Sequence, residues 1–416
     1  MRPVGFFSPS PNGCIPQGER EDMKFNRRQF IKSAAAVTTV AALPGAPFIR
    51  SAAAADTIKV GILHSLTGTI AIAEASVVDA EKLAIEEINA AGGVMGKKLE
   101  VVVEDGASDW PTFAEKARKL LENDKVAAIF GCYTSASRKA VLPVMERYKG
   151  LLYYPTYYEG LERSDNIMYT AQEGTQSAIA SLDWLYKNKG KSFYLIGSDY
   201  IWPRTMNKLA NLHLKKIGAK VVGESYYPLG SIEFASEINK IKAAKPEVIW
   251  STVVGGSNVA FYKQMNAAGI TGKNQALCAM AVSEEEASGV GPENLVGFMS
   301  CMGYFQSLKN PANEKFVKAF KAKYGANRVV GDTMECGYIS VYLWKLAVEK
   351  AKSIEVPKVV AASSELPLDA PEGKVKFHKD NHHLWKHARI GTFRADGQID
   401  MIYESPLIEP NPFAKI

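Results

Sequence analysis

The stretch VAAIFGCYTSASRKAVLPVMERYKGLLYYPTYY, residues 126–158, contains the unit that decides the fold. An apolar run at Val126–Phe130 leads through a short loop into a helical pattern at Ser135–Tyr148, and a second apolar run follows at Leu151–Tyr154. Two strands joined by so short a helical connection lie parallel, and a parallel sheet needs helices on both of its faces. This stretch therefore predicts an α/β unit built on a parallel sheet.

The same strand–helix unit recurs along the chain in two runs, residues 57–172 and 174–303. We predict an α/β fold of two doubly wound, Rossmann-like lobes joined by a hinge that the chain crosses several times. The predicted ranges are residues 56–173 plus 304–370 for the first lobe and residues 174–303 plus 371–416 for the second. Ligands of open α/β sheets bind outside the carboxyl ends of the strands, so the cleft between the lobes is the expected binding site.

The last hundred residues depart from this repeat. Long helical patterns at Pro311–Tyr324 and Thr333–Ala351 are expected to return to the first lobe. Two short strands, Arg389–Arg394 and Gln398–Glu404, are joined through a turn containing Asp396-Gly397, which predicts a hairpin added to the second lobe.

Residues 1–55 read as a leader. The segment NRRQFIK at residues 26–32 precedes an apolar, Ala-rich stretch that ends in small residues before Asp56. This order predicts an export signal of the twin-arginine type, cut after Ala55, with Met23 as the true start. The apolar stretch contains Pro44 and Pro47 and is too short to anchor the chain in a membrane. We expect a periplasmic protein.

Composition excludes several classes of function. The 416 residues are 47% hydrophobic and 23% charged, which is typical of a folded globular protein. The formal charge is +6, of which residues 1–55 carry +4, so the remainder carries no basic run suited to nucleic acid. The cysteines and histidines lack zinc-binding spacings, and we expect neither a metal nor a cofactor.

Aromatic and hydroxyl side chains follow three successive predicted strands. If these strand ends converge, they form a small box that suits an uncharged polar ligand, because buried polar groups discriminate strongly when left unmatched. The candidates are Tyr133, Ser135, Tyr154, Thr156, Tyr200 and Trp202.

Three residues from later strand ends are candidates for the opposite side of the cleft: Ser283, Glu284 and Tyr304. A glutamate there can accept amide N–H bonds. The alternative interpretation of Glu284 is a solvated residue at the start of a helix, within the run of acids at residues 284–286.

Several segments resemble the urea and short-chain amide binding proteins, a branch of the type I periplasmic binding proteins related to branched-chain amino acid receptors and amide sensors. These segments are residues 131–143, 154–160, 197–204, 257–264, 304–307, 369–373 and 389–397. The resemblance runs from about Ile58 to Pro412. It implies two lobes that close on a small amide and present it to the permease of an ABC importer in the inner membrane.

The resemblance also bears on individual residues. The ligand positions of the amide-sensing members fall on Tyr133, Ser135, Tyr154, Thr156, Tyr200 and Trp202. Trp202 stands where that pattern has Tyr, and Tyr157 stands where it has Pro.

We therefore expect a receptor that captures urea or a short-chain aliphatic amide and performs no chemistry. The alternative within the same fold is a branched-chain or other amino-acid receptor, which needs partners for a carboxylate and an ammonium group. An amidase with Cys132 as nucleophile and an extracytoplasmic amide sensor are further alternatives.

Overall fold

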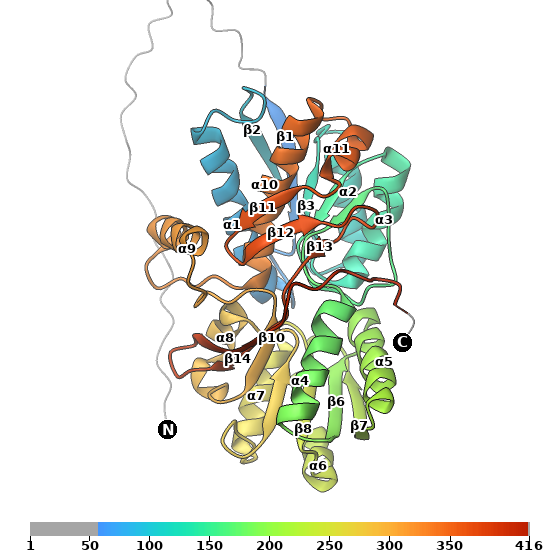
Figure 1. Ribbon diagram of the computed structural model, residues 1–416, viewed down its shortest axis with the longest axis vertical. Helices are drawn as coiled ribbons and strands as arrows, with labels where there is room; N and C mark the ends of the chain where they lie inside the picture. Colours follow the sequence, from blue (N-terminus) through green and yellow to red (C-terminus); the bar gives the residue numbers. More distant parts are fainter. Residues whose placement is uncertain (1–56, 415–416) are drawn as a thin grey trace, which may run out of the picture. The chain divides into compact units, whose positions relative to one another are not determined.

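The computed structural model describes residues 57–414 (Figure 1). The predicted leader, its start at Met23 and its cut after Ala55 lie outside these residues.

The first lobe is built on a five-stranded parallel sheet in the order β2-β1-β3-β4-β5. Its strands are β1 (Ile58–His64), β2 (Leu99–Asp105), β3 (Ile129–Gly131), β4 (Leu152–Tyr154) and β5 (Ile167–Tyr169). The helices in this part of the chain are α1 (Ala71–Ala90), α2 (Trp110–Glu122) and α3 (Ser135–Tyr148). Six of the seven residues of β1 are buried, as expected of a strand covered on both faces.

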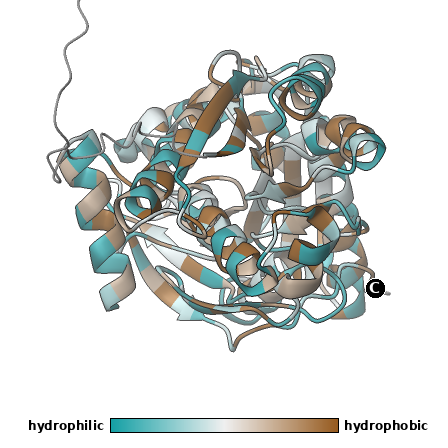
Figure 2. Cartoon of the chain, turned by 90° about the horizontal axis from the view of Figure 1, so that it is seen from above, coloured by the Kyte–Doolittle hydropathy of each residue, from teal (hydrophilic) through white to brown (hydrophobic). Residues whose placement is uncertain are grey.

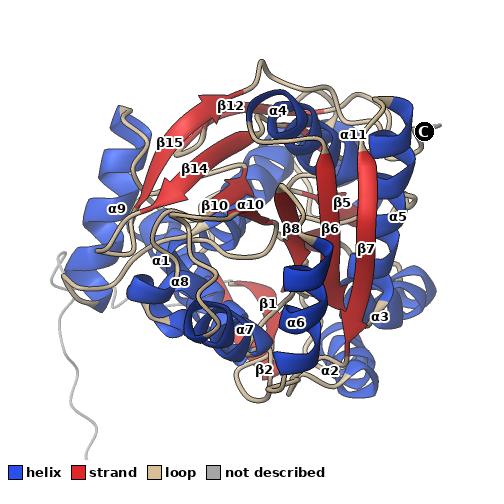
Figure 3. Cartoon of the chain, turned by 90° about the horizontal axis from the view of Figure 1, so that it is seen from below, coloured by secondary structure: helices blue, strands red, loops and turns tan. Residues whose placement is uncertain are grey.

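The second lobe is built on a seven-stranded sheet in the order β15-β14-β10-β9-β8-β6-β7 (Figure 3). Its strands are β6 (Ser192–Ser198), β7 (Lys220–Tyr227), β8 (Val248–Thr252), β9 (Ala276–Ala279), β10 (Met299–Met302), β14 (Arg389–Phe393) and β15 (Ile399–Glu404). Its helical segments are the π-helix η1 (Thr175–Ile179), α4 (Ala180–Asn188), α5 (Ile201–Lys216), α6 (Ala235–Ala244), α7 (Ser257–Ala267), α8 (Glu284–Val290) and the 3-10 turn η2 (Pro292–Asn294). The predicted hairpin is confirmed, since β14 and β15 are antiparallel and β14 pairs with β10.

Both sheets reverse their strand order at one point, and this positions the site. In the first sheet β2 and β3 flank β1, and in the second β7 and β8 flank β6. The loops after neighbouring strands part in opposite directions at such a point and leave a crevice at the carboxyl ends. The crevice of the first lobe lies between the ends of β1 and β3, and that of the second between β6 and β8.

The tail helices return to the first lobe, as predicted. These helices are α9 (Pro311–Tyr324), α10 (Asp332–Ala351) and α11 (Val356–Ser363). Met334, Ile339 and Trp344 of α10 are fully buried in the same hydrophobic cluster as Val60 of β1. Figure 2 shows hydrophobic residues along the strands, while the surface helices carry both hydrophobic and hydrophilic residues.

A small antiparallel sheet bears on the predicted lobe boundaries. It contains β11 (Pro367–Ala370), β12 (Gly373–Phe377) and β13 (Leu384–Trp385). The predicted boundary after Ala370 falls between β11 and β12, yet Val375, Phe377 and Leu384 pack in the hydrophobic cluster of the first lobe. We therefore propose that the chain leaves the first lobe for the last time after Trp385.

The chain crosses between the sheets after β5, after β10 and after β13, and polar contacts tie these crossings together. Gln172 Nε2 donates to His387 O at 2.6 Å, and the Arg389 guanidinium donates to Gly303 O. Asp332 Oδ1 accepts the backbone N–H of Gly303 at 2.9 Å. The three crossings thus form the predicted multi-crossing hinge.

Among the described residues, no helix combines the length and apolar character needed to cross a membrane.

Candidate ligand-binding site

A sharp turn after β3 directs the chain into the crevice of the first lobe. Gly131 has φ of +150°, and a Cβ there would lie 2.1 Å from Leu63 O, so only glycine fits. Cys132 follows with φ of +62°, and its N–H donates to Leu63 O at 2.9 Å. Thr134 then caps α3 by accepting the N–H of Ser137 at 3.0 Å. The turn places residue 133 at the carboxyl end of the sheet.

Tyrosines from two strand ends meet at this edge. The Tyr154 hydroxyl donates to Tyr133 O at 2.6 Å, and the hydroxyls of Tyr133 and Tyr157 lie 2.9 Å apart. The ring of Tyr157 lies 5.4 Å from the ring of Trp202, which belongs to α5 of the second lobe. Tyr157 stands where the amide-sensor pattern has Pro and was not a predicted ligand residue. In the structure it contacts both lobes.

Tyr200 also reaches the first lobe from the start of α5. Burial raises the pKa of its phenol, and the neighbouring Tyr154 and Glu159 raise it further. Trp202 is 2% exposed, and its Nε1 has no hydrogen-bond partner among the described residues. The structure thus brings the four predicted aromatic residues together with Tyr157. We call these five residues the aromatic box: Tyr133, Tyr154, Tyr157, Tyr200 and Trp202.

The two predicted hydroxyl residues of the first lobe are bonded to protein. Ser135 Oγ donates to Glu159 Oε2 at 2.5 Å and accepts Arg138 Nη1 at 3.1 Å. Thr156 Oγ1 donates to Cys132 O at 3.4 Å. Both residues are buried beside the box, and Ser135 connects it to a group of charged residues.

Arg138 is the centre of that group, and it is not among the site residues predicted from the sequence. Its Nε donates to Glu162 Oε1 at 2.7 Å and its Nη2 to Glu159 Oε1 at 3.3 Å, while its guanidinium lies 4.8 Å from the Tyr154 ring. Burial raises the pKa of Glu162, but Arg138 and Lys139 outweigh it and lower the pKa to about 2. The buried guanidinium is therefore committed to two carboxylates.

Glu286 faces the box from the second lobe, in place of the predicted Glu284. Ser283 forms a capping box with Glu286, whose Oε2 accepts the Ser283 N–H at 2.8 Å and the Ser283 hydroxyl at 2.5 Å. The Tyr133 hydroxyl donates to the other oxygen of Glu286 at 3.3 Å. Burial raises the pKa of Glu286. The Ser-x-x-Glu spacing is the sequence signal that identifies this residue.

Glu284 and Tyr304 are directed elsewhere. Glu284 Oε1 accepts the N–H of Gln306 at 2.7 Å, and the Tyr304 hydroxyl donates to Asn313 Oδ1 of α9 at 2.5 Å. Tyr304 packs in the first-lobe cluster with Phe316. Among the described residues, the hydrogen bonds of Glu284 and Tyr304 therefore lead away from the aromatic box. The interpretation of Glu284 as a solvated residue is wrong, because the residue is 1% exposed. Burial raises its pKa to about 8.

The lobes touch around the box. Gly256 of the second lobe donates its N–H to Thr69 O at 3.2 Å, and Ser76 of α1 donates to the Glu285 carboxylate of α8. Together with the contact from Tyr133 to Glu286, these bonds hold the described lobes in a closed arrangement.

A cavity of about 350 Å³ lies between the segment after β4, helix α5 and the tail, and no residue of the aromatic box is among its lining residues. It is lined by Glu159 and Leu161 of the first lobe, by Leu209 and Leu212 of α5, and by Pro412 of the tail. Glu159, which accepts the Ser135 hydroxyl, is the residue that links this cavity to the surroundings of the box.

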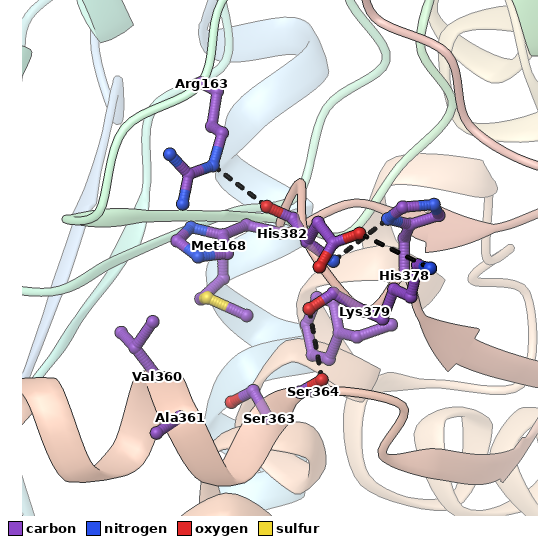
Figure 4. A pocket seen from close by; sticks show the side chains of 11 residues that line it. Arg163, Met168, Val360, Ala361, Ser363, Ser364, His378, Lys379 and His382 are labelled. Carbon is purple, nitrogen blue, oxygen red and sulfur yellow. Dashed lines mark hydrogen bonds and ion pairs between the residues drawn. The ribbon is translucent and has the colours of Figure 1, made fainter.

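A cavity of about 540 Å³ lies on the first lobe, away from the predicted site (Figure 4). Arg163, His378, Lys379 and His382 line it, and an Arg163 N–H donates to Asp380 O. Arg163 pairs with Asp165 at 2.9 Å, and His378 Nε2 lies 3.1 Å from a glutamate oxygen of the tail, so both side chains have partners.

One group of metal-type ligands converges among the described residues: Glu335, Cys336 and Glu372. Lys386 is buried beside them, with its Nζ 3.4 Å from Cys336 Sγ and paired with the Glu372 carboxylate. This ammonium group already supplies a cation to the cluster. The four described cysteines, Cys132, Cys278, Cys301 and Cys336, are buried and free.

The sequence is similar to known periplasmic binding proteins over nearly the whole described chain. The sequence profile of the periplasmic binding protein domain matches residues 58–416, and that of the twin-arginine translocation pathway signal matches residues 24–44. A Leu/Ile/Val-binding protein homolog 7 from Brucella melitensis is 25% identical over 389 residues, which cover 88% of this chain and 95% of the relative. A Leu/Ile/Val-binding protein homolog 8 from Brucella abortus is 27% identical over 380 residues, covering 85% and 92%.

Solved structures share the fold at lower identity. A solute-binding protein of an ABC transporter from Rhodopseudomonas palustris, in complex with 3,4-dihydroxybenzoic acid, has a TM-score of 0.76 at 22% identity and covers 85% of this chain and 98% of its own. A leucine-binding protein from Thermotoga maritima has a TM-score of 0.74 at 20% identity, covering 84% and 98%. The chain belongs to the periplasmic binding protein domain family and is an exported, periplasmic solute-binding receptor.

Proposed function

We propose that this receptor captures urea or a short-chain aliphatic amide in the aromatic box and delivers it to an ABC importer in the inner membrane. The observation that carries the proposal is the combination of tyrosine hydroxyls facing Glu286 with an arginine whose charge is already neutralised.

The polar groups of the box match both ends of an amide. The hydroxyls of Tyr133 and Tyr157 can donate or accept, and Glu286 accepts N–H groups. Trp202 Nε1 is a buried donor without a partner among the described residues, and a carbonyl oxygen can accept its hydrogen bond. Buried polar groups of this kind favour a ligand that satisfies all of them, because an unmatched group costs about 1–3 kcal/mol.

The charges disfavour a carboxylate ligand. Arg138 is the arginine nearest the box, and it is held by Glu159 and Glu162. A ligand carboxylate would have to take Arg138 from these acids, or be buried without a cation, which is costly. A neutral amide needs no such partner.

A branched-chain or other amino-acid ligand is the second candidate, and the names of the Brucella relatives favour it. Glu286 would serve the ammonium group, and the hydroxyls near the start of α3 would have to serve the carboxylate. The charge balance described above argues against this ligand, while a titration can distinguish the two directly.

A catalytic role for Cys132 is not supported. The thiol is fully buried, and this burial raises its pKa far above that of a nucleophilic cysteine. The proposal is therefore for binding and transfer of an unaltered solute.

Calorimetric titration of the mature protein with urea, formamide, acetamide and leucine tests the proposal. We expect saturable one-site binding of at least one of the three amides, and weaker or undetectable binding of leucine. Tight binding of leucine alone would refute the amide assignment and establish the second candidate.

A further inference from the structure

Glu74 is a buried glutamate close to the end of β1, and one of its carboxylate oxygens has no hydrogen-bond partner among the described residues. Glu74 lies in the first turn of α1, and its Oε2 accepts the Ser65 N–H at 2.7 Å and lies 2.9 Å from His64 Nδ1. The side chain is fully buried, and its Oε1 has no hydrogen-bond partner among the described residues. A buried carboxylate oxygen without a donor is costly, so it calls for an explanation.

The surroundings of Glu74 carry surplus negative charge. His64 Nε2 lies 3.2 Å from Glu81 Oε1, so one imidazole is shared by two carboxylates. Burial lowers the pKa of His64, but Glu81 and Glu74 outweigh it and raise the pKa to about 10, so the ring is an imidazolium at neutral pH. Two carboxylates around one imidazolium leave one net negative charge.

This charge lies at the carboxyl end of β1, next to the strand end that leads into the aromatic box. The N–H of Cys132 donates to Leu63 O, which sets the end of β3 directly beside the end of β1. Glu74 raises the pKa of the Cys132 thiol and of the Tyr200 phenol, so its carboxylate is within electrostatic range of residues from both lobes. Glu74 therefore lies at the crevice of the first sheet, with Tyr200 approaching from the crevice of the second.

We infer that Glu74 contacts the ligand, that its Oε1 accepts a ligand N–H, and that it makes the receptor select solutes with N–H donors, neutral or cationic, and exclude carboxylates. The inference rests on the proposed function, because it assumes that the ligand occupies the aromatic box. It deepens that function by assigning specificity to a residue outside the predicted set.

Glu81 offers a matched control in the same ion group. It bonds the other nitrogen of His64, is also fully buried and also has one oxygen without a hydrogen-bond partner among the described residues, but it lies two turns further along α1, against Gly337 of α10. Glu74→Gln and Glu81→Gln remove the same charge from the same imidazolium, and Glu74 is the one of the two that bonds the Ser65 N–H just after β1.

The experiment titrates the mature wild type, Glu74→Gln and Glu81→Gln with three molecules of nearly the same shape: acetamide, the acetamidinium cation and acetate. Calorimetry at neutral pH gives three affinities for each protein.

In the wild type we expect acetate to bind at least about tenfold more weakly than acetamide and acetamidinium, because it places a negative charge beside Glu74. In Glu74→Gln we expect acetamidinium to lose about tenfold in affinity, acetamide about threefold, and acetate to gain relative to both. Glu81→Gln should preserve the wild-type ratios within about threefold.

The outcomes separate the inference from the proposed function. A wild type that binds neither urea nor any amide refutes the proposed function. A wild type that binds acetamide, together with equal effects of Glu74→Gln on all three ligands or equal effects of the two variants, refutes the inference alone. If Glu74→Gln does not fold by circular dichroism, the wild-type ranking decides, since acetate binding more tightly than acetamidinium contradicts the inference.

Discussion

Glu162, behind the aromatic box in the first lobe, and Glu284, in the second lobe, respond to burial in opposite ways. Glu162, behind the first-lobe side, is 7% exposed, and its pKa is lowered to about 2. Glu284, at the start of α8 in the second lobe, is 1% exposed, and its pKa is raised to about 8. Burial opposes ionisation of both residues. Arg138 and Lys139 reverse its effect at Glu162, whereas the nearby charges at Glu284 are those of other acids.

This difference teaches that a buried acid acquires its charge state from its partners. The first-lobe side holds ionised carboxylates whose charge is matched by cations. The second-lobe side holds carboxyl groups with raised pKa values, and a protonated carboxyl group can donate as well as accept a hydrogen bond. Of these second-lobe acids, Glu286 contacts the aromatic box, and its position there suits a neutral ligand with both donors and acceptors.

The largest expected effect on this difference between the two glutamates is that of Arg138→Met, which removes the cation beside Glu162. This variant leaves Glu159 and Glu162 buried without a cation, and we expect the free energy of unfolding to fall by about 3–5 kcal/mol. Chemical denaturation measures the change. Arg204→Met is the control, because Arg204 pairs with Asp199 on the exposed surface and should cost under about 1 kcal/mol. Equal losses in both variants would contradict the assignment of a buried ion group.

The second prediction concerns pH and Glu284→Gln. The folded wild type keeps the Glu284 proton up to about pH 8, whereas the unfolded chain loses it near its ordinary pKa of 4.5. The unfolded state then binds fewer protons between these values, so this group lowers the free energy of unfolding as the pH rises. We expect Glu284→Gln to be more stable than the wild type at the alkaline end by on the order of 2 kcal/mol, with the gain vanishing below about pH 4.5.

Denaturation curves across this pH range test the prediction, and Glu162→Gln supplies the opposite case. The ionised Glu162 stabilises the fold above its unfolded pKa, and this contribution is lost as the pH falls toward 2. Glu162→Gln should therefore be destabilised at neutral pH and approach the wild type in acid. Parallel pH profiles for the two variants would show that the glutamates do not differ.

The third prediction concerns the contribution of one hydroxyl of the aromatic box to ligand affinity. Tyr157→Phe removes the hydroxyl that faces Tyr133, and we expect the affinity for the best amide ligand to fall by about 1 kcal/mol, or roughly fivefold. Calorimetry measures the affinity, and Tyr342→Phe is the matched control, since its hydroxyl bonds Glu87 at 2.6 Å on the outer side of the first lobe. An unchanged affinity in Tyr157→Phe would show that the ligand lies elsewhere.

The smallest effect is expected at Tyr304. Tyr304→Phe removes the hydrogen bond to Asn313 and should lower the free energy of unfolding by about 1 kcal/mol while leaving ligand affinity unchanged. Thermal unfolding and calorimetry on the same sample check both parts. A loss of affinity without a loss of stability would restore Tyr304 to the ligand site.

Much of the fold could be predicted from local patterns. Helix α3, the long helices α9 and α10, and the final hairpin all begin and end within a few residues of their predicted bounds. The alternation of apolar runs with helical patterns is a property of neighbouring residues, so it is visible without knowledge of distant contacts. The same holds for the first-lobe part of the aromatic box, because β3 and β4 are parallel strands whose carboxyl ends lie at one edge of their sheet. Tyr200 and Trp202 follow β6 of the other sheet, so their approach to these residues depends on how the lobes pack.

The charges of the site and the direction of its side chains could not be predicted in this way. Arg138 and Glu162 are 24 positions apart, and Tyr133 and Glu286 are 153 apart, yet each pair forms a hydrogen bond in or beside the aromatic box. Whether Glu284 or Glu286 faces the box depends on the turn of α8 and on its packing against the first lobe. The protonation of a buried group depends on every charge near it in space. Those neighbours come from distant segments, so only the folded chain decides them.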